Sequence, residues 1–175
     1  MIISVAELKQ YITTTANDSV LEAKLQALEL AIREYTNNNF QNRNIRYKAN
    51  VTSGMILCPA TYFEAGDTVQ ISESKLNSGI YTVDSKVEDA DGLVIKGRLY
   101  DEADVLVTKV EYPADVKQGV IDIMDWKLRN SDKAGISAET ISRYSVTYDR
   151  TSMNTKLGVP SELVGFLKPY MKAKF

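Results

Sequence analysis

The sequence contains no histidine and a single cysteine, Cys58. Without histidine, the chain has no Ser–His–Asp or Cys–His catalytic group, no imidazole metal ligand and no histidine acid–base catalysis. One cysteine excludes a disulfide within the chain and a zinc site built from thiolate and imidazole. We therefore predict no catalytic residues, no metal site and no cofactor. An enzyme would be left with carboxylate, lysine or serine chemistry.

Long apolar runs and a strong charge excess are also missing. No apolar stretch approaches the roughly 20 residues that a membrane-spanning helix requires, so we expect no membrane partner. The formal net charge of −2 argues against a protein dedicated to binding nucleic acid. With 175 residues, 44% of them apolar, the chain is long enough for one domain or for one domain that carries a small inserted one.

Apolar residues at helical spacing occur near both ends of the chain. Ser4 and Ser19 each begin a capping box, with Glu three residues later. Pro113 and Pro160 are suitable first-turn residues for two later helices. The second and third helices are predicted by two apolar stripes, made of Leu21, Leu25, Leu28, Ile32 and Tyr35 and of Val116, Val120, Ile123 and Met124.

Between these helices, the apolar period changes from about four residues to two. Ile45, Tyr47, Ala49 and Val51 alternate with polar residues, and short strand-like runs separated by turn signals follow. We predict an α+β fold, in which a small helical body of about four helices (residues 1–42 and 113–175) carries an inserted β-rich subdomain (residues 43–112).

Arg143 to Tyr148 alternates like a strand but lies between two helical stretches. Because no strand-like partner adjoins it in the sequence, we expect it to pair with a neighbouring subunit or with an edge of the β-rich subdomain. Beyond the last helix, Lys168, Lys172 and Lys174 accompany Tyr170, Met171 and Phe175. Apolar groups at a chain end are expected to dock, either on the chain's own body or on a partner.

The C-terminal segments ISAETISRYSVTY and GVPSELVGFLKPYMKAKF resemble head–tail connector proteins, also called adaptors or head-completion proteins. These belong to long-tailed double-stranded-DNA bacteriophages of Gram-positive hosts. LKQYI, LEAKLQALELAIREYTNNNF and VKQGVIDIMDWKLRN fit the same pattern. The resemblance covers residues 1–42 and 113–175, and the β-rich subdomain departs from the simplest, all-helical members.

The resemblance implies a non-enzymatic virion protein that assembles in the host cytoplasm. Such proteins form a ring, typically dodecameric, between the portal and a stopper or tail-completion protein, and DNA passes through the channel without tight binding. The interface residues that we predict on this basis are Ile141, Arg143, Tyr144, Val146, Tyr148, Phe166, Lys168, Tyr170, Lys172, Lys174 and Phe175.

The β-rich subdomain leaves a second function open, that of a carbohydrate- or peptide-binding module. Tyr47, Tyr62, Tyr81 and Tyr100 are candidates for stacking on sugars or bases. Half-buried packing is the commoner role of tyrosines in strands. The acidic loops around Glu88 and Glu102 do not match the twelve-residue calcium loop, so we predict that they are solvated.

Overall fold

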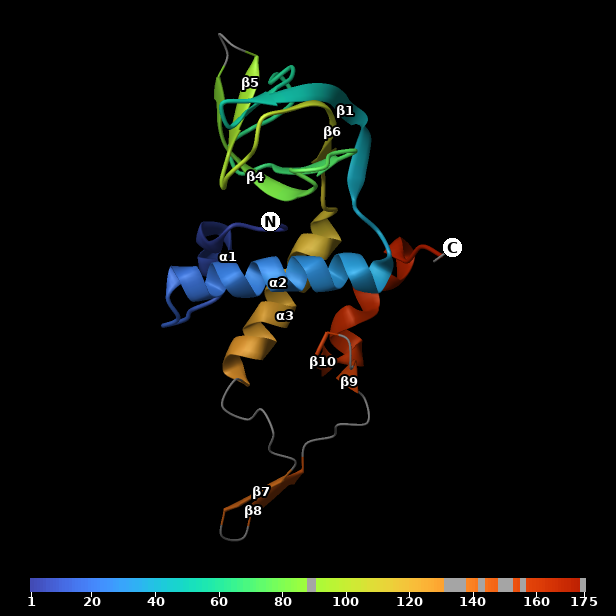
Figure 1. Cartoon of the computed structure of the whole chain (residues 1–175). Coiled ribbons are helices and arrows are strands. Elements are labelled where there is room, and N and C mark those ends of the chain that lie inside the picture. Colours follow the sequence, from blue (N-terminus) through green and yellow to red (C-terminus); the bar gives the residue numbers. More distant parts are fainter. Residues whose placement is uncertain (88–90, 131–137, 142–143, 148–152, 155–156, 174–175) are drawn as a thin grey trace. The chain divides into compact units, whose positions relative to one another are not determined.

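The computed structural model describes residues 1–87, 91–130, 138–141, 144–147, 153–154 and 157–173 (Figure 1). The chain divides into two compact units. One consists of Met1 with Asn39–Tyr112, and the other of Ile2–Asn38 with Pro113–Phe175. They are called below the barrel unit and the helical unit, and each is described by itself.

The barrel unit is a closed barrel of six antiparallel strands (Figure 1). The strands are β1 (Gln41–Thr52), β2 (Met55–Leu57), β3 (Thr68–Ser72), β4 (Gly79–Val87), β5 (Gly92–Ile95) and β6 (Glu102–Val110). Their order around the barrel is β1-β2-β5-β4-β3-β6, and β6 pairs with β1 to close it.

The long strand β1 takes part in closure along most of its length. It pairs with β2 near its end and with β6 from Gln41 to Val51, with register shifts between Gln41 and Arg46 and between Ala49 and Val51. Such irregularities bend a strand and increase its twist. Ser53 and Gly54 then reverse the chain with φ values of 52° and 78°, and left-handed conformations of this kind suit a tight hairpin turn.

The inside of the barrel is filled by apolar side chains from all six strands and the loops between them. Phe63, Val69 and Leu93 are fully buried. The remaining members of this core are Ala49, Val51, Ile56, Cys58, Ala60, Ile71, Val83, Ile95, Leu99, Val105 and Val107. Alternate residues of each strand supply them, as the period of two requires.

The predicted fold class, a small helical body with an inserted β-rich subdomain, is wrong. Strands dominate the chain, and six of them form a closed barrel. The described residues contain four short helical segments. The error has a physical origin, because alternation shows which side chains face inward but not which strands pair. Closure depends on the pairing of β1 with β6, two strands far apart in the sequence.

The helical unit contains α1 (Val5–Tyr11), α2 (Asp18–Thr36), α3 (Ala114–Arg129) and a 3-10 helix, η3 (Ser161–Tyr170). Ser4 caps α1 as predicted, since its hydroxyl accepts the Glu7 N–H at 3.0 Å. The second predicted cap is wrong, because α2 begins before Ser19, with Asn17 at the N-cap. The buried apolar side chains include Leu8, Leu21, Leu25, Leu28, Ile32, Val116, Val120, Ile123, Met124, Val164 and Leu167.

Gly119 lies in the middle of α3, where the absence of a side chain leaves room for Phe166 of η3. A Cβ atom at position 119 would lie 2.2 Å from a carbon of the Phe166 ring. Real contacts of that kind are essentially never so short, so the ring of Phe166 packs directly on the backbone of α3. This contact holds η3 on its own unit and explains a glycine inside a helix, where glycine is unfavourable.

We expect Gly119→Ala to destabilise the protein by about 1–3 kcal/mol, because overpacking outweighs the gain of about 1 kcal/mol in helix propensity. Urea unfolding followed by circular dichroism measures this free energy. Gly165→Ala is the control, since a Cβ atom there meets nothing within 4 Å. In a Phe166→Ala background, the same Gly119→Ala change should cease to destabilise. Equal stability of Gly119→Ala and wild type would contradict the packing described.

Candidate functional site

The predicted lone strand has a partner within its own chain. Strand β8 (Tyr144–Thr147) pairs antiparallel with β7 (Ala138–Ile141). The register places Ile141 opposite Tyr144 and Glu139 opposite Val146. The expectation that no partner strand adjoins this stretch in the sequence is therefore wrong, whereas pairing with a neighbouring subunit or with an edge of the β-rich subdomain stays a prediction. The two residues between the strands, Ser142 and Arg143, include none of the Gly, Asn or Asp that signal a tight hairpin, so the pattern concealed it.

The sheet formed by β7 and β8 is small. Among the described strands, β7 pairs only with β8, and β8 pairs only with β7. An isolated two-stranded hairpin is marginally stable in water. Its outer edges also carry N–H and C=O groups that favour the addition of a further strand. These edges make the β7–β8 hairpin the candidate interaction site of the helical unit.

The residues predicted for the interface are spread over several parts of the chain. Ile141, Tyr144 and Val146 belong to the β7–β8 hairpin. Phe166 packs on Gly119, whereas Lys168 and Lys172 are exposed. The other predicted positions, Arg143, Tyr148, Lys174 and Phe175, lie outside the described residues.

The chain after η3 is bound to its own helical unit. The Lys172 N–H donates to the Thr36 carbonyl at 2.8 Å. The side-chain amides of Asn37 and Asn38 donate to the carbonyls of Ala173 and Tyr170, at 2.7 and 3.1 Å. Thr36 is the last residue of α2, and Asn37 and Asn38 follow it directly. This part of the tail therefore docks on the chain itself, one of the two possibilities left open above.

Tyr170 is held on a second side by α3. Its hydroxyl donates to the two carboxylate oxygens of Asp115, at 2.8 and 2.9 Å. The hydrogen bond to this carboxylate is the main reason why the pKa of Tyr170 is raised. Tyr170 is thus engaged within the helical unit, and the exposed lysines Lys168 and Lys172 remain available to a partner.

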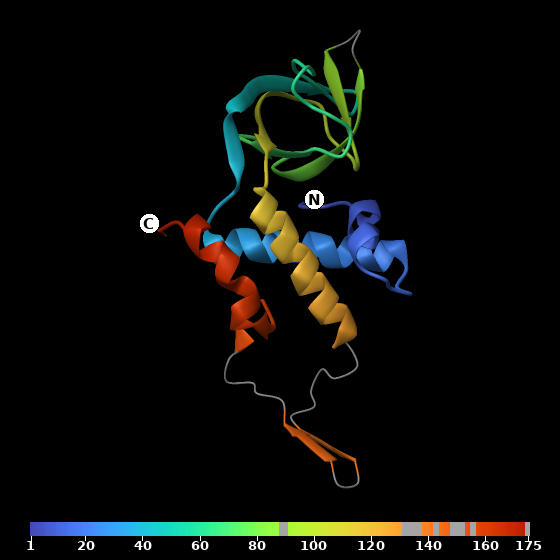
Figure 2. The ribbon, with the colours of Figure 1, turned by 180° about the vertical axis from the view of Figure 1, so that it is seen from behind.

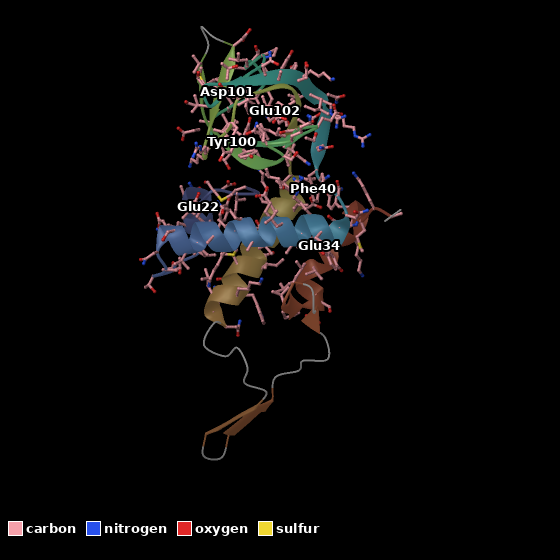
Figure 3. The ribbon with its side chains drawn as sticks, in the orientation of Figure 1. Glu22, Glu34, Phe40, Tyr100, Asp101 and Glu102 are labelled. Atoms are coloured by element: carbon pink, nitrogen blue, oxygen red, sulfur yellow. The ribbon has the colours of Figure 1, made fainter. Side chains whose placement is uncertain are left out.

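In the barrel unit, Glu102 at the start of β6 binds the loop between β3 and β4 (Figure 3). Its carboxylate accepts the Ser74 hydroxyl at 2.5 Å and the N–H groups of Lys75 and Leu76 at 2.6 and 3.2 Å. The side-chain amide of buried Asn77 donates to it at 2.9 Å. These hydrogen bonds favour the ionised form and lower the pKa of Glu102.

Asn77 and Asp101 extend this network. The Asn77 side chain donates to the Tyr100 carbonyl and accepts the Tyr100 N–H, both at 2.8 Å. Asp101 accepts the N–H of Ser53 at 2.8 Å and so holds the β1–β2 turn. The sequence predicted solvated acidic loops, and Asp101 is exposed and Glu102 only partly buried, but both side chains also anchor the backbone of neighbouring turns. Only the pairing of strands brings their partners within reach.

The four candidate tyrosines do not form one stacking surface. Tyr47 and Tyr81 are partly buried against the barrel core. Tyr62 and Tyr100 are exposed, at 58% and 48%. The Tyr62 carbonyl accepts a hydrogen bond from Lys109, near the end of β6, while Tyr100 lies just before its start. A strand of this length spans roughly 25 Å, so the two exposed rings lie near opposite ends of the barrel.

The single cysteine is poorly suited to chemistry. Cys58 is 4% exposed, and burial, with a smaller contribution from the charge of Asp91, raises the pKa of its thiol to about 12. The thiolate is the reactive form of cysteine. Within the described residues, no group of three or more His, Cys, Asp or Glu side chains is arranged to hold a metal ion. The described helices include none with the length and apolar character of a membrane span.

Comparison with known proteins identifies no family for this chain. No family model matches it, and no curated protein matches it.

We expect Glu102→Gln to reduce the dependence of stability on pH. A carboxylate whose pKa is lowered by folding stabilises the folded state above its ordinary pKa, and this stabilisation is lost as the pH falls through the folded pKa. Wild type should therefore lose more unfolding free energy than Glu102→Gln between neutral pH and about pH 3. Urea titrations at each pH measure the difference. Asp84→Asn, at an exposed carboxylate of β4, is the control, and an equal loss in all three proteins would contradict the role of Glu102.

Cys58 should resist thiol reagents in the folded protein, because its thiol is buried and has a raised pKa. When a chromogenic disulfide is added at about pH 8, the fraction of Cys58 that is labelled should rise with urea concentration in step with the fraction of unfolded protein. A Lys96→Cys variant, which adds an exposed thiol, should incorporate one label rapidly in native buffer. Equally rapid labelling of wild type would show that the barrel opens to solvent around Cys58.

Proposed function

We propose that this chain is a structural, non-enzymatic virion protein of the head–tail connector type. In this proposal, copies form a ring between the portal and a stopper or tail-completion protein, complete the DNA-filled head and continue its channel. Two observations support it. One is the resemblance of residues 1–42 and 113–175, and the other is the pairing of the β7–β8 hairpin, which lies within the resembling region.

The single observation that carries the proposal is the small size of the β7–β8 sheet. Four paired positions are too few for independent stability, and no other described strand extends the sheet. A strand added from outside would satisfy an open edge by main-chain hydrogen bonds, which need no particular side chains. The hairpin is thus a natural contact between protein copies or with a neighbouring virion protein.

A closed ring fits a hairpin that has two different open edges. If the outer edge of β7 in one copy meets the outer edge of β8 in the next, the contact is head-to-tail. Repetition of a head-to-tail contact closes into a ring when the rotation permits, and every edge is then covered. A single binding partner would cover one edge and leave the other open.

The charge of the chain is compatible with a conduit for DNA. Neutral to weakly acidic proteins make few of the phosphate contacts that dominate DNA affinity, and the net charge here is −2. DNA is therefore expected to pass through the channel without tight binding. The alternative function, a carbohydrate- or peptide-binding module on the barrel, gains less support, because its exposed tyrosines lie near opposite ends of β6.

We expect replacement of residues 138–147 by a Gly-Ser linker of equal length to abolish ring formation while the thermal melt of the rest of the chain is retained. Without the hairpin, no strand edge remains at this site for a neighbour. Sedimentation velocity and negative-stain electron microscopy, each with and without purified portal, report the rings. Leu76→Ser, which changes an exposed barrel residue and leaves the hairpin intact, is the control.

Two results would count against the proposal in different ways. If the linker variant forms rings as wild type does, the hairpin is not the contact. If wild type forms no ring with or without portal, and particles lacking the protein still join heads to tails, the connector function itself is wrong.

A further inference from the structure

Strand β1 is much longer than its neighbour β2. β1 has 12 residues and β2 has 3, and Figure 2 shows β1, in teal, as a long strand that bends around the barrel. β2 pairs with β1 only from Asn50 to Thr52. The preceding residues, Arg46 to Ala49, pair with β6 on one side. No described strand pairs with them on the other side, so β1 has an open edge there although the barrel as a whole is closed.

The register of the hairpin formed by β1 and β2 shows which main-chain groups face this edge. Thr52 and Met55 flank the two-residue turn, and residues in that position exchange hydrogen bonds with each other. Main-chain groups alternate between the two sides of a strand. Those of Asn50 therefore also point toward β2, and those of Lys48 and Arg46 point the same way, beyond the end of β2. The register shift near Asn50 adds its extra residue to β6, so the alternation along β1 is not interrupted.

The N–H and C=O groups of Arg46 and Lys48 have no partner on this side among the described residues. The backbone hydrogen bonds between loops and strands of the barrel unit involve other residues. Main-chain groups left open at the edge of a sheet accept a further strand. Residues 45–48 are called below the β1 edge.

The inward-facing side chains also indicate that a strand is missing beside the β1 edge. Ala49 and Val51 lie where β2 is present or close by, and they are 5% and 2% exposed. Ile45 and Tyr47 pack against the same core but are only partly buried. A strand added at the β1 edge would cover their remaining apolar surface, and that burial is favourable.

The outer face of the β1 edge is positively charged. Arg46 and Lys48 are two residues apart, so their side chains share this face, and both are exposed. Arg46 donates to two uncharged groups, the Thr108 hydroxyl and the side-chain oxygen of Gln41, each at 3.1 Å. Of the ion pairs that join described residues, none involves Arg46 or Lys48.

The carboxylates of neighbouring segments do not neutralise these two charges. Asp104 belongs to β6, and Glu111 directly follows it, so both lie on the side of β1 that is opposite to the open edge. Glu111 accepts the side-chain amide of Asn42 at 2.8 Å. Glu64, in the loop after β2, forms an ion pair with Lys86 at 2.9 Å. The β1 edge thus combines open main-chain groups, half-covered apolar residues and two uncompensated cations.

We propose that the β1 edge binds an extended segment of another protein, in which carboxylates alternate with apolar residues, as an added strand. Its main chain bonds to Arg46 and Lys48. Its apolar side chains cover Ile45 and Tyr47 on the inner face, while its carboxylates lie opposite the two cations on the outer face. Addition of a strand to a sheet edge is a common mode of peptide recognition. The site lies in the barrel unit and does not depend on the connector function proposed above.

Two other interpretations of the β1 edge explain less. Charged side chains on an edge strand protect it against unwanted pairing, but protection does not account for the half-covered Ile45 and Tyr47. A second copy of this chain could supply its β7–β8 hairpin. The two strands of that hairpin, however, carry a single carboxylate, Glu139, for the two cations.

The experiment uses the full chain and two synthetic peptides of equal length. One alternates Val with Glu, and the other alternates Val with Lys. Fluorescence anisotropy at low and moderate salt measures the affinity of each. We expect the Glu peptide to bind at least about tenfold more tightly than the Lys peptide, because two favourable cross-strand charge pairs are replaced by two unfavourable ones. Its affinity should fall as salt screens the charges.

Modified Glu peptides test the main-chain contact. One version carries N-methyl groups on the amides of its Glu residues only, and the other on the amides of its Val residues only. Successive amides point to opposite sides of a strand, so one version should lose about tenfold or more in affinity and the other should bind nearly as well as the unmodified peptide. Amide hydrogen exchange of Arg46 and Lys48, measured by NMR, should be fast in the free chain and slow in the complex.

Variants of the chain place the binding at the β1 edge. Lys48→Gln removes one charge pair and should weaken the Glu peptide by about fivefold at most. Lys48→Pro also removes the open N–H and should weaken it by about tenfold more. Proline is tolerated at this position because the lost N–H faces the open edge and not β6, and a circular dichroism melt checks that the barrel is retained. Lys75→Gln, at an exposed lysine of the barrel, is the control and should have no effect.

The remaining outcomes overturn the proposal. If neither peptide binds, the cations only protect the edge. Equal binding of the Glu and Lys peptides would mean that Arg46 and Lys48 do not select the partner. An equal effect of the two N-methylated versions would exclude strand addition. Self-association of the chain that Lys48→Pro abolishes, with no binding of either peptide, would show that a second copy occupies the β1 edge.

Discussion

The pairing of β1 with β6 is the contact on which the arrangement of the chain depends. It closes the barrel, and at its start it sets Gln41 opposite Val110. Just beyond, the Glu111 N–H donates to the Phe40 carbonyl at 2.9 Å, and the rings of Phe40 and Tyr112 lie 5.0 Å apart. The chain therefore enters and leaves the barrel unit at neighbouring points. This allows a whole barrel to stand between α2 and α3 in the sequence while α2 and α3 belong to one compact unit.

Barrel closure also creates the loop network at Glu102. Because β3 runs antiparallel to β6 and ends opposite Leu106, the loop after β3 continues toward the start of β6, where the Glu102 carboxylate reaches the N–H groups of Lys75 and Leu76. A carboxylate bound by several donors is held firmly, and the loop that it binds is held with it. Asn77 of this loop in turn binds the backbone of Tyr100. The exposed side chains of Leu76 and Tyr100 do not bear on the proposed connector role.

The β7–β8 hairpin and the tail after η3 differ in what they offer a partner. The β7–β8 hairpin has main-chain groups at its edges, which favour another strand with little regard to its side chains. The tail, residues 170–173, is less available for binding a partner than its apolar residues indicated. Its backbone is hydrogen-bonded to Thr36, Asn37 and Asn38 of the same helical unit.

The local elements can be located from patterns in the amino-acid sequence. Apolar spacing located α2 and α3, alternation located β1, and the Ser4 capping box marked the start of α1, since each of these depends on residues a few positions apart. Tertiary structure alone decided the closed barrel, the role of Glu102 and the place of Gly119, which is explained only by Phe166 lying against it. The β7–β8 hairpin stayed hidden although its strands are neighbours, because the two residues between them in the sequence include no Gly or Asn. These features rest on contacts between distant residues, or on backbone pairing without a side-chain signature, and neither leaves a periodic pattern in the sequence.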